Sequence, residues 1–204
     1  FLGDAINNSQ YNELRMYIDV IDGKYVNPNS DPLTVGTTDY MKPFQAAGLN
    51  KSIPWYQVVG NHDHFWTGVF TPNDYINQTF VGSNVLNVGE LMNGASLDSR
   101  GRYMGIIDGT TEYGVVIKAG PVANFTTPPQ VNANPDRRHL TKEAWISEFA
   151  NTTSNPSGHG LTSTSVPGCY TFEPKGNLPI KVIVFDDTQD DNCAFGQGAI
   201  AGLT

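Results

Sequence analysis

Expectations about the fold start from Ile53-Pro54-Trp55-Tyr56-Gln57-Val58-Val59-Gly60-Asn61-His62-Asp63-His64. The mostly apolar residues 53–59 are typical of a buried β-strand, and the next five carry amide, imidazole and carboxyl groups. A strand that ends this way presents polar side chains at the carboxyl edge of a sheet, where ligands bind in open α/β folds. Gly3-Asp4 follows another short apolar run, Phe1-Leu2. We therefore expect two strand ends to bring metal-binding side chains together.

The composition fits one domain of ordinary size. The chain has 204 residues, of which 39% are hydrophobic and only 16% charged, and its 21 glycines and 13 prolines are typical of a loop-rich protein. A formal net charge of -8 argues against a nucleic-acid partner, because phosphate binding needs clustered Lys and Arg. No apolar run is long enough to cross a bilayer, so we expect no membrane span. Low lysine content with abundant Asn, Thr, Tyr and Gly favours a periplasmic or secreted protein, with the cytoplasm as the alternative.

The region before residues 53–59 predicts two helices. Apolar residues at helical spacing predict a first helix that starts near Asn8, is capped by Asn8 or Ser9, and ends at Gly23. This apolar face consists of Tyr11, Leu14, Ile18 and Ile21. A second, shorter helix is expected at 40–47. The order strand, helix, helix, strand predicts a crossover between neighbouring parallel strands, and therefore an α/β fold.

Residues 65–168 predict a loop-rich insertion within a single domain that spans residues 1–204. Gly, Asn, Thr and Pro recur every few residues there, which suits a surface over the active edge better than a core. The short regular pieces are strands at 104–107 and 113–118 and a helix at 142–149, capped by Thr141 with Glu143 and Glu148 toward solvent. A hairpin of strands 169–172 and 180–185 follows, and its second strand is apolar enough to be central in a sheet.

Three polar residues near the two strand ends are candidate site residues. Asp4 offers a carboxylate that can bridge two cations, although an aspartate there also suits a helix cap. Asn61 offers a neutral amide oxygen for a mixed nitrogen and oxygen ligand set, and is otherwise a turn residue. His62 can protonate a leaving oxygen because imidazole titrates near neutrality, although single histidines also serve structural roles.

These residues resemble a known pattern. Gly3-Asp4 followed by Gly60-Asn61-His62-Asp63 resembles the second and third motifs of the calcineurin-like metallophosphoesterases. Further strings resemble a mostly uncharacterised bacterial subgroup of that superfamily: Asn12-Glu13-Leu14-Arg15, Pro43-Phe44-Gln45-Ala46-Ala47-Gly48-Leu49 and Pro135-Asp136-Arg137-Arg138. The resemblance implies an α+β sandwich of sheets flanked by helices and a dinuclear metal centre. It also implies that the enzyme is a hydrolase, a phosphatase acting on a small phosphomonoester or phosphodiester.

The resemblance further implies roles for single residues. Asp4 would bridge two divalent or trivalent ions of Mn, Fe or Zn, Asn61 would bind the second ion, and His62 would be the general acid for the leaving alkoxide. Asp63 would brace the loop through backbone N–H groups rather than touch metal. Asn7 stands where many family members have an aspartate that holds the catalytic histidine, and its amide can accept the same bond.

The other metal motifs of the family do not occur in the 204 residues. These are an Asp-x-His before Gly3-Asp4, and a single His and a Gly-His-x-His after the central strands. We therefore expect a fragment of a longer enzyme that holds metal weakly on its own. Two alternatives stay open: a phosphoesterase scaffold that has lost catalysis, and a non-enzymatic exported ligand-binding or surface module in which residues 60–63 are only a turn.

Further polar residues have both a functional and a structural interpretation. His64 could reach the rim of the metal site, and His159, between two glycines, could line a cleft or simply belong to a loop. Asp186-Asp187 ends an apolar strand and could approach the site or form a turn. Cys169 and Cys193 are either buried thiols or, in an oxidising compartment, a disulfide.

A basic cluster surrounds His139. Together with Arg137 and Arg138 it could bind an anion such as phosphate. A surface salt-bridge cluster with Asp136 and Glu143 is the alternative. No pattern in the sequence predicts an oligomeric state.

Overall fold

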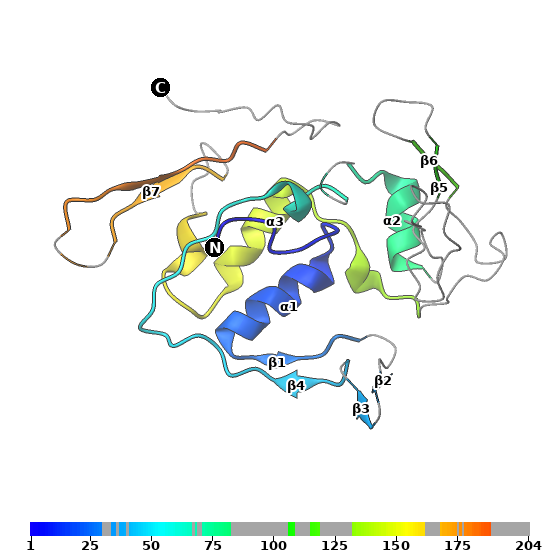
Figure 1. The fold of residues 1–204 in the computed structure, drawn as a ribbon, viewed down its shortest axis with the longest axis horizontal. Coiled ribbons are helices and arrows are strands. Elements are labelled where there is room, and N and C mark those ends of the chain that lie inside the picture. The colour runs from blue at the N-terminus through cyan, green and yellow to red at the C-terminus, as the bar shows by residue number, and fades with distance from the viewer. Residues whose placement is uncertain are drawn as a thin grey trace. The chain divides into compact units, whose positions relative to one another are not determined.

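The computed structural model describes residues 1–29, 34–35, 37–39, 41–66, 68, 71–82, 106–108, 115–118, 132–161, 168–174, 176 and 178–188. These residues form a mixed α/β arrangement of short helices and two-stranded antiparallel sheets (Figure 1). Backbone contacts divide the chain into two compact units. Unit 1 comprises residues 1–28, 42–72 and 139–204, and unit 2 comprises residues 29–41 and 73–138. The expected insertion, residues 65–168, is therefore shared between the units.

The first helix, α1, covers Tyr11–Asp22 and ends at Gly23, as its spacing predicts. Its apolar face packs into the core of unit 1, whose buried members are Ile6, Leu14, Ile18, Trp55, Val59, Leu140, Trp145, Phe149 and Leu161. The cap expected from Asn8 or Ser9 is wrong, because Gln10 occupies the cap position and its side chain makes no capping bond.

The helix expected at 40–47 is wrong. Phe44–Gln45 forms strand β4, which pairs antiparallel with strand β1, Tyr25–Val26. The Ala46 N–H extends this pairing with a 3.0 Å hydrogen bond. Pro43 has no N–H and disfavours the helical conformation in the residue before it, so pairing with β1 outweighs a local helix.

Residues 53–59 do not form a regular strand. On one side the Phe1 amino group donates to the Tyr56 carbonyl at 2.8 Å, and the Val58 N–H donates to the Phe1 carbonyl at 3.1 Å. This alternation is typical of parallel pairing. On the other side two N–H groups of the segment donate to carbonyls of the loop 155–159, at 3.0 and 3.1 Å. The expected parallel neighbour is therefore present, but a loop takes the place of a second strand and no ladder forms.

Helix α3, Lys142–Glu148, confirms the helix expected after Thr141. The Thr141 hydroxyl accepts a hydrogen bond from the backbone of the first turn at 3.2 Å, as a capping threonine does. Glu143 is exposed as expected. Glu148 is instead half-buried and pairs with Arg15 of α1 at 3.1 Å, so its expected place in open solvent is wrong.

The predicted hairpin in unit 1 is confirmed. Strand β7, Tyr170–Phe172, pairs antiparallel with strand β8, Val182–Val184. Among the residues that the structure describes, β8 pairs only with β7, so it is not central in a sheet there.

Unit 2 contains helix α2, Asp74–Val81, which the residue pattern did not indicate. The strands that the structure describes in this unit are short and pair as two antiparallel hairpins. They are β2 (Thr34–Val35) with β3 (Thr38–Asp39), and β5 (Ile106–Asp108) with β6 (Val115–Lys118). The second pair confirms the hairpin expected from 104–107 and 113–118 over the part that is described.

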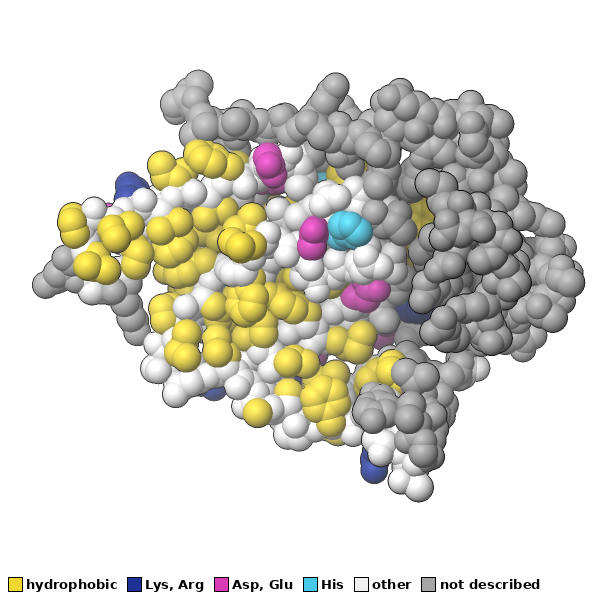
Figure 2. All heavy atoms as spheres, viewed as in Figure 1, with side chains coloured by type: hydrophobic (Ala, Val, Ile, Leu, Met, Phe, Trp, Pro, Cys, Tyr) yellow, Lys and Arg dark blue, Asp and Glu magenta, His cyan; other side chains and the backbone are white. Residues whose placement is uncertain are grey.

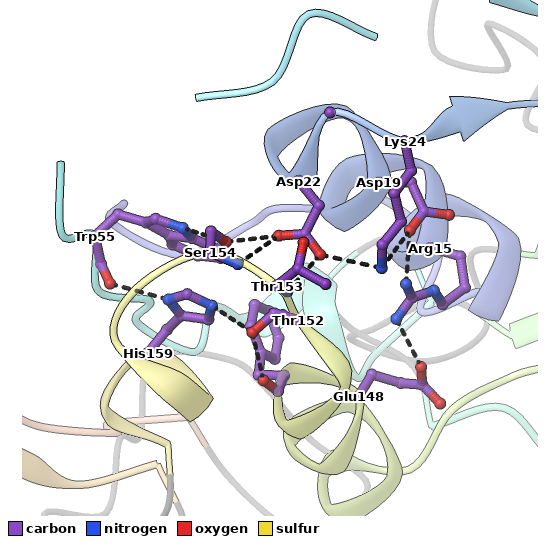
Figure 3. Close-up of polar contacts among 12 residues, drawn as sticks. Arg15, Asp19, Asp22, Lys24, Trp55, Glu148, Thr152, Thr153, Ser154 and His159 are labelled. Atoms are coloured by element: carbon purple, nitrogen blue, oxygen red, sulfur yellow. Dashed lines mark hydrogen bonds and ion pairs between the residues drawn. The ribbon is translucent and has the colours of Figure 1, made fainter. Parts of the chain in front are cut away.

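A buried polar network joins α1 to the loop after α3 (Figure 3). The Asp22 carboxylate accepts hydrogen bonds from the Thr153 N–H at 2.9 Å, and from the Ser154 N–H and hydroxyl at 3.1 and 2.6 Å. Lys24 pairs with the same carboxylate at 3.1 Å. The Ser154 hydroxyl in turn accepts from Trp55 Nε1 at 2.9 Å. These bonds fix the loop against α1 and against residues 53–59.

His159 belongs to this core rather than to a cleft. Its ring is fully buried and stacks on Trp55 with 3.5 Å between the ring centroids. Nδ1 lies 3.1 Å from the Trp55 carbonyl oxygen and Nε2 lies 2.7 Å from Thr152 Oγ1 (Figure 3). The Trp55 carbonyl can only accept, so His159 donates to it from Nδ1, and burial lowers the pKa of the ring.

Candidate functional site

The candidate site forms where the segment after Phe1-Leu2 meets the turn after residues 53–59. Gly60 lies so close to Asp4 that a Cβ at position 60 would overlap the Asp4 carboxylate and backbone nitrogen. The His62 N–H donates to Asp4 Oδ1 at 3.0 Å. The structure thus brings together the two segments that the sequence predicts to meet, with Asp4 beside the 3₁₀ turn Asn61–Asp63.

Asp63 holds the two segments together from below the surface. Its side chain is fully buried, and it accepts hydrogen bonds from the Ile6 N–H at 3.2 Å and from the Gly60 N–H at 2.8 Å. Burial raises the pKa of Asp63 to about 7, although the N–H donors act to lower it. This is the geometry expected of a carboxylate that braces the loop.

His62 is held by Asn7 through one ring nitrogen. His62 Nδ1 lies 2.9 Å from Asn7 Oδ1 and 3.1 Å from the Asn7 carbonyl oxygen. Both partners are hydrogen-bond acceptors, so Nδ1 carries a proton and Nε2 is the nitrogen that can exchange a proton with a substrate. Asn7 therefore makes the contact that the resemblance assigns to an aspartate at this position.

Glu13 is a supporting residue that the sequence patterns did not single out. Its carboxylate accepts hydrogen bonds from the Asn7 N–H at 3.1 Å and the Asn8 N–H at 2.9 Å. Glu13 lies in the first turn of α1, but it bonds N–H groups that precede the cap residue Gln10. The capping-box pattern, in which the third helical residue bonds the N–H of the cap residue, therefore does not identify it. The carboxylate fixes the turn that presents Asn7 to His62.

Asp4 and Asn61 are the oxygen donors that could contact a metal ion. A carboxylate and an amide oxygen suit Mn, Fe or Zn as parts of a mixed ligand set. Among the residues that the structure describes, no group of three or more His, Cys, Asp and Glu side chains is arranged to hold a metal ion. Asp4 and Asn61 could supply part of a coordination shell, but among the described residues they do not form a complete metal centre.

His64 turns into a buried polar cluster. The residue is 6% exposed, and its Nε2 lies 2.8 Å from Thr188 Oγ1. The Thr188 hydroxyl donates to Asp186 at 2.5 Å, and Asp186 pairs with Lys142 at 2.9 Å. The cluster ties the turn after residues 53–59 to the end of β8 and the start of α3. Of the two roles expected for Asp186, approaching the site or forming a turn, it has the turn role.

The residues around His139 make separate contacts. Arg138 pairs with Asp136 at 3.1 Å, which is part of the expected salt-bridge cluster. Arg137 donates instead to backbone carbonyls of unit 2, at 2.7 Å to Phe80, 2.9 Å to Gly82 and 2.6 Å to Asn132. His139 lies in unit 1, where its Nδ1 is 2.9 Å from Ser9 Oγ.

Stability at acid pH is expected to depend on His139. Burial lowers the pKa of His139 to about 4, from 6.5 in an exposed histidine. At His139 the unfolded chain therefore binds more protons between these values, so the contribution of His139 to stability is complete above about pH 6.5 and is lost as the pH drops toward 4, whereas the raised pKa of Asp63 acts in the opposite direction in this range. After allowance for solvent screening, we expect a loss on the order of 1–2 kcal/mol. The difference in unfolding free energy between the wild-type protein and His139→Gln, measured with urea, should shift by this amount in favour of the variant from pH 6.5 to 4, and a difference that does not change with pH would contradict the assignment.

Cys169 Sγ accepts a hydrogen bond from the Asp186 N–H at 3.2 Å, and Cys193 lies outside the described residues. No helix in the part of the chain that the structure describes is long and apolar enough to span a membrane.

Comparison of this chain with protein-family models, with curated proteins and with solved structures finds no match.

Proposed function

We propose that this chain belongs to a metal-dependent phosphoesterase of the calcineurin-like kind. The observation that supports the proposal is the meeting of Asp4, Asn7, Asn61 and His62 at one place. The His62 N–H bonds to Asp4 at 3.0 Å, and the His62 ring bonds to Asn7 at 2.9 Å. This arrangement gives a hydrolase an oxygen ligand and an oriented imidazole side by side.

In the proposed reaction His62 is the proton donor. The Asn7 oxygens hold the proton on Nδ1, so that Nε2 of the imidazolium delivers a second proton to the departing oxygen of the ester. Asp4 fixes the backbone of the turn that carries this ring. Transition-metal ions, when bound, would supply a hydroxide nucleophile and neutralise charge on the phosphoryl oxygens. Asp4 and Asn61 are the residues of this chain that would contact them.

Leaving-group dependence tests the role of His62. The assay uses the chain, and any longer form of the protein that contains it, with Mn²⁺ and two esters. One is p-nitrophenyl phosphate, whose leaving group needs little protonation, and the other is a simple alkyl phosphate, whose leaving group needs much. We expect His62→Asn to lower kcat about 10²- to 10⁴-fold on the alkyl ester and much less on the p-nitrophenyl ester.

The result has clear alternatives. If His62→Asn lowers kcat equally on both esters, His62 is not the general acid, but the protein is still a phosphoesterase. Absence of hydrolysis of either ester by every form of the wild-type protein would overturn the proposed function.

An apolar surface favours a second candidate function, that of a non-enzymatic binding module. Many large apolar side chains of unit 1 are exposed: Phe1, Leu2, Val20, Tyr25, Phe44, Ile53, Leu178, Ile180, Ile183 and Phe185. Figure 2 shows hydrophobic side chains gathered over much of one face. Contiguous apolar surface of this kind often marks an interaction site. A binding module would hydrolyse neither ester, which separates it from the first proposal.

A further inference from the structure

The orientation of the Asn61 side chain is set by a closed series of hydrogen bonds. The Asn61 carbonyl accepts from the Phe65 N–H at 3.0 Å, the Phe65 carbonyl accepts from the Gly68 N–H at 3.1 Å, and the Gly68 carbonyl accepts from Asn61 Nδ2 at 2.8 Å. Phe65 is only 1% exposed and anchors this series in the interior. The Asn61 amide is therefore connected to a fixed part of the backbone.

The Gly68 carbonyl selects one of the two orientations that an amide can take. With Nδ2 bound to Gly68, Oδ1 lies on the other side of the amide group and is the atom presented for contact with a cation. Reversal of the amide would place Oδ1 against the Gly68 carbonyl, and two acceptors would then face each other without a proton. The amide hydrogen bond thus decides whether position 61 offers an oxygen or an N–H.

Gly68 also gives the site its space. The residue is buried and its φ is 74°. A Cβ at this position would lie 2.5 Å from Asn61 Nδ2 and 2.5 Å from both Cδ2 and Nε2 of His62. Any side chain would therefore press on both residues at once, and on the ring nitrogen of His62 that is free to act.

We propose that Gly68 is a positioning residue for the candidate site, whose carbonyl orients the Asn61 amide and whose missing side chain leaves room for Asn61 and His62. Its effect on a reaction rests on the proposed function, whereas the orientation of Asn61 does not. Sequence patterns pass over Gly68 because it contributes a backbone carbonyl and the absence of a side chain.

Nuclear magnetic resonance of the Asn61 side-chain amide tests the orientation in the chain without metal or substrate. We expect the Asn61 amide protons of the wild-type protein to exchange more slowly than those of exposed Asn50. Gly68→Ala should speed the Asn61 exchange by roughly fivefold to tenfold, as expected for loss of one hydrogen bond. Wild-type Asn61 protons that exchange as fast as those of Asn50 would overturn the proposal without any variant.

Gly176→Ala is the matched control. Gly176 also has a positive φ, 112°, but a Cβ there meets no atom within 4 Å. Gly176→Ala therefore introduces backbone strain, as Gly68→Ala does, but no contact of the added methyl group with Asn61 or His62. If Gly176→Ala changes Asn61 as much as Gly68→Ala does, strain accounts for the effect and the proposal is wrong.

Activity separates this proposal from the proposed function. If the protein hydrolyses phosphoesters, Gly68→Ala should lower kcat/KM about 10- to 100-fold, as loss of a supporting contact to a ligand does, whereas Gly176→Ala should not. If the Asn61 exchange responds to Gly68→Ala but the wild-type protein hydrolyses no ester, Gly68 positions Asn61 and the proposed function fails. No change in Asn61 exchange in Gly68→Ala would overturn the positioning role.

Discussion

Gly60→Ala is expected to separate the two segments of the candidate site and to destabilise unit 1 by about 3 kcal/mol. The added Cβ would overlap the Asp4 carboxylate and the Asp4 backbone nitrogen, so a change of rotamer cannot relieve it. One segment must move away, and the 3.0 Å hydrogen bond from the His62 N–H to Asp4 Oδ1 is then lost. The Gly60 N–H bond to Asp63 at 2.8 Å is strained by the same movement.

Two measurements check this result. Urea unfolding gives the change in stability, and amide hydrogen exchange at His62 reports the bond to Asp4. Gly176→Ala serves as the control, because its added methyl group meets no atom within 4 Å, so that any loss of stability there comes from backbone strain at its φ of 112° and not from an overlap. A Gly60→Ala protein with wild-type stability and unchanged exchange at His62 would show that the segments are not in contact at Gly60.

Short-range sequence patterns predict those helices and hairpins whose hydrogen bonds join residues close together in the chain. The apolar spacing and Gly23 were enough for α1, because a helix bonds within itself. The same holds for α3 after Thr141, and for the β7–β8 hairpin across its turn. Local signals miss the strand Phe44–Gln45 because its partner strand, Tyr25–Val26, lies far from it along the chain.

The sequence predicts those parts of the candidate site that depend on the identity of side chains. The strand-end positions of Asp4 and Asn61-His62 led to the expectation that they meet, and the resemblance led to the contact of Asn7 with His62. The hydrogen bonds of Glu13 and Gly68 at the site each involve a backbone group, the Asn7 N–H for Glu13 and the Gly68 carbonyl for Gly68, and residue types do not mark such groups. No pattern of residue types identifies such contacts before the path of the backbone is known.

Lys142→Met is expected to lower the free energy of unfolding by about 3–5 kcal/mol, because it leaves a buried carboxylate without its cation. Lys142 and Asp186 pair at 2.9 Å with side chains only 9% and 5% exposed. Thr188 gives Asp186 bonds from its N–H at 3.0 Å and its hydroxyl at 2.5 Å, but neither carries a charge. The same hydroxyl lies 2.8 Å from His64 Nε2, so a displaced Asp186 also loosens the turn of the candidate site.

A control and a second variant distinguish an unpaired buried charge from lost packing. Lys24→Met removes a cation that also pairs with a buried carboxylate, Asp22, at 3.1 Å, but Lys24 is 37% exposed. Since Asp22 keeps hydrogen bonds from Thr153 and Ser154, we expect a loss of about 1 kcal/mol or less.

The double variant Lys142→Met with Asp186→Leu should recover much of the stability, because an apolar pair of similar size can replace a buried ion pair. Urea unfolding of the three variants decides the matter: a double variant no more stable than Lys142→Met would mean that packing, and not the charge on Asp186, fixes the end of β8.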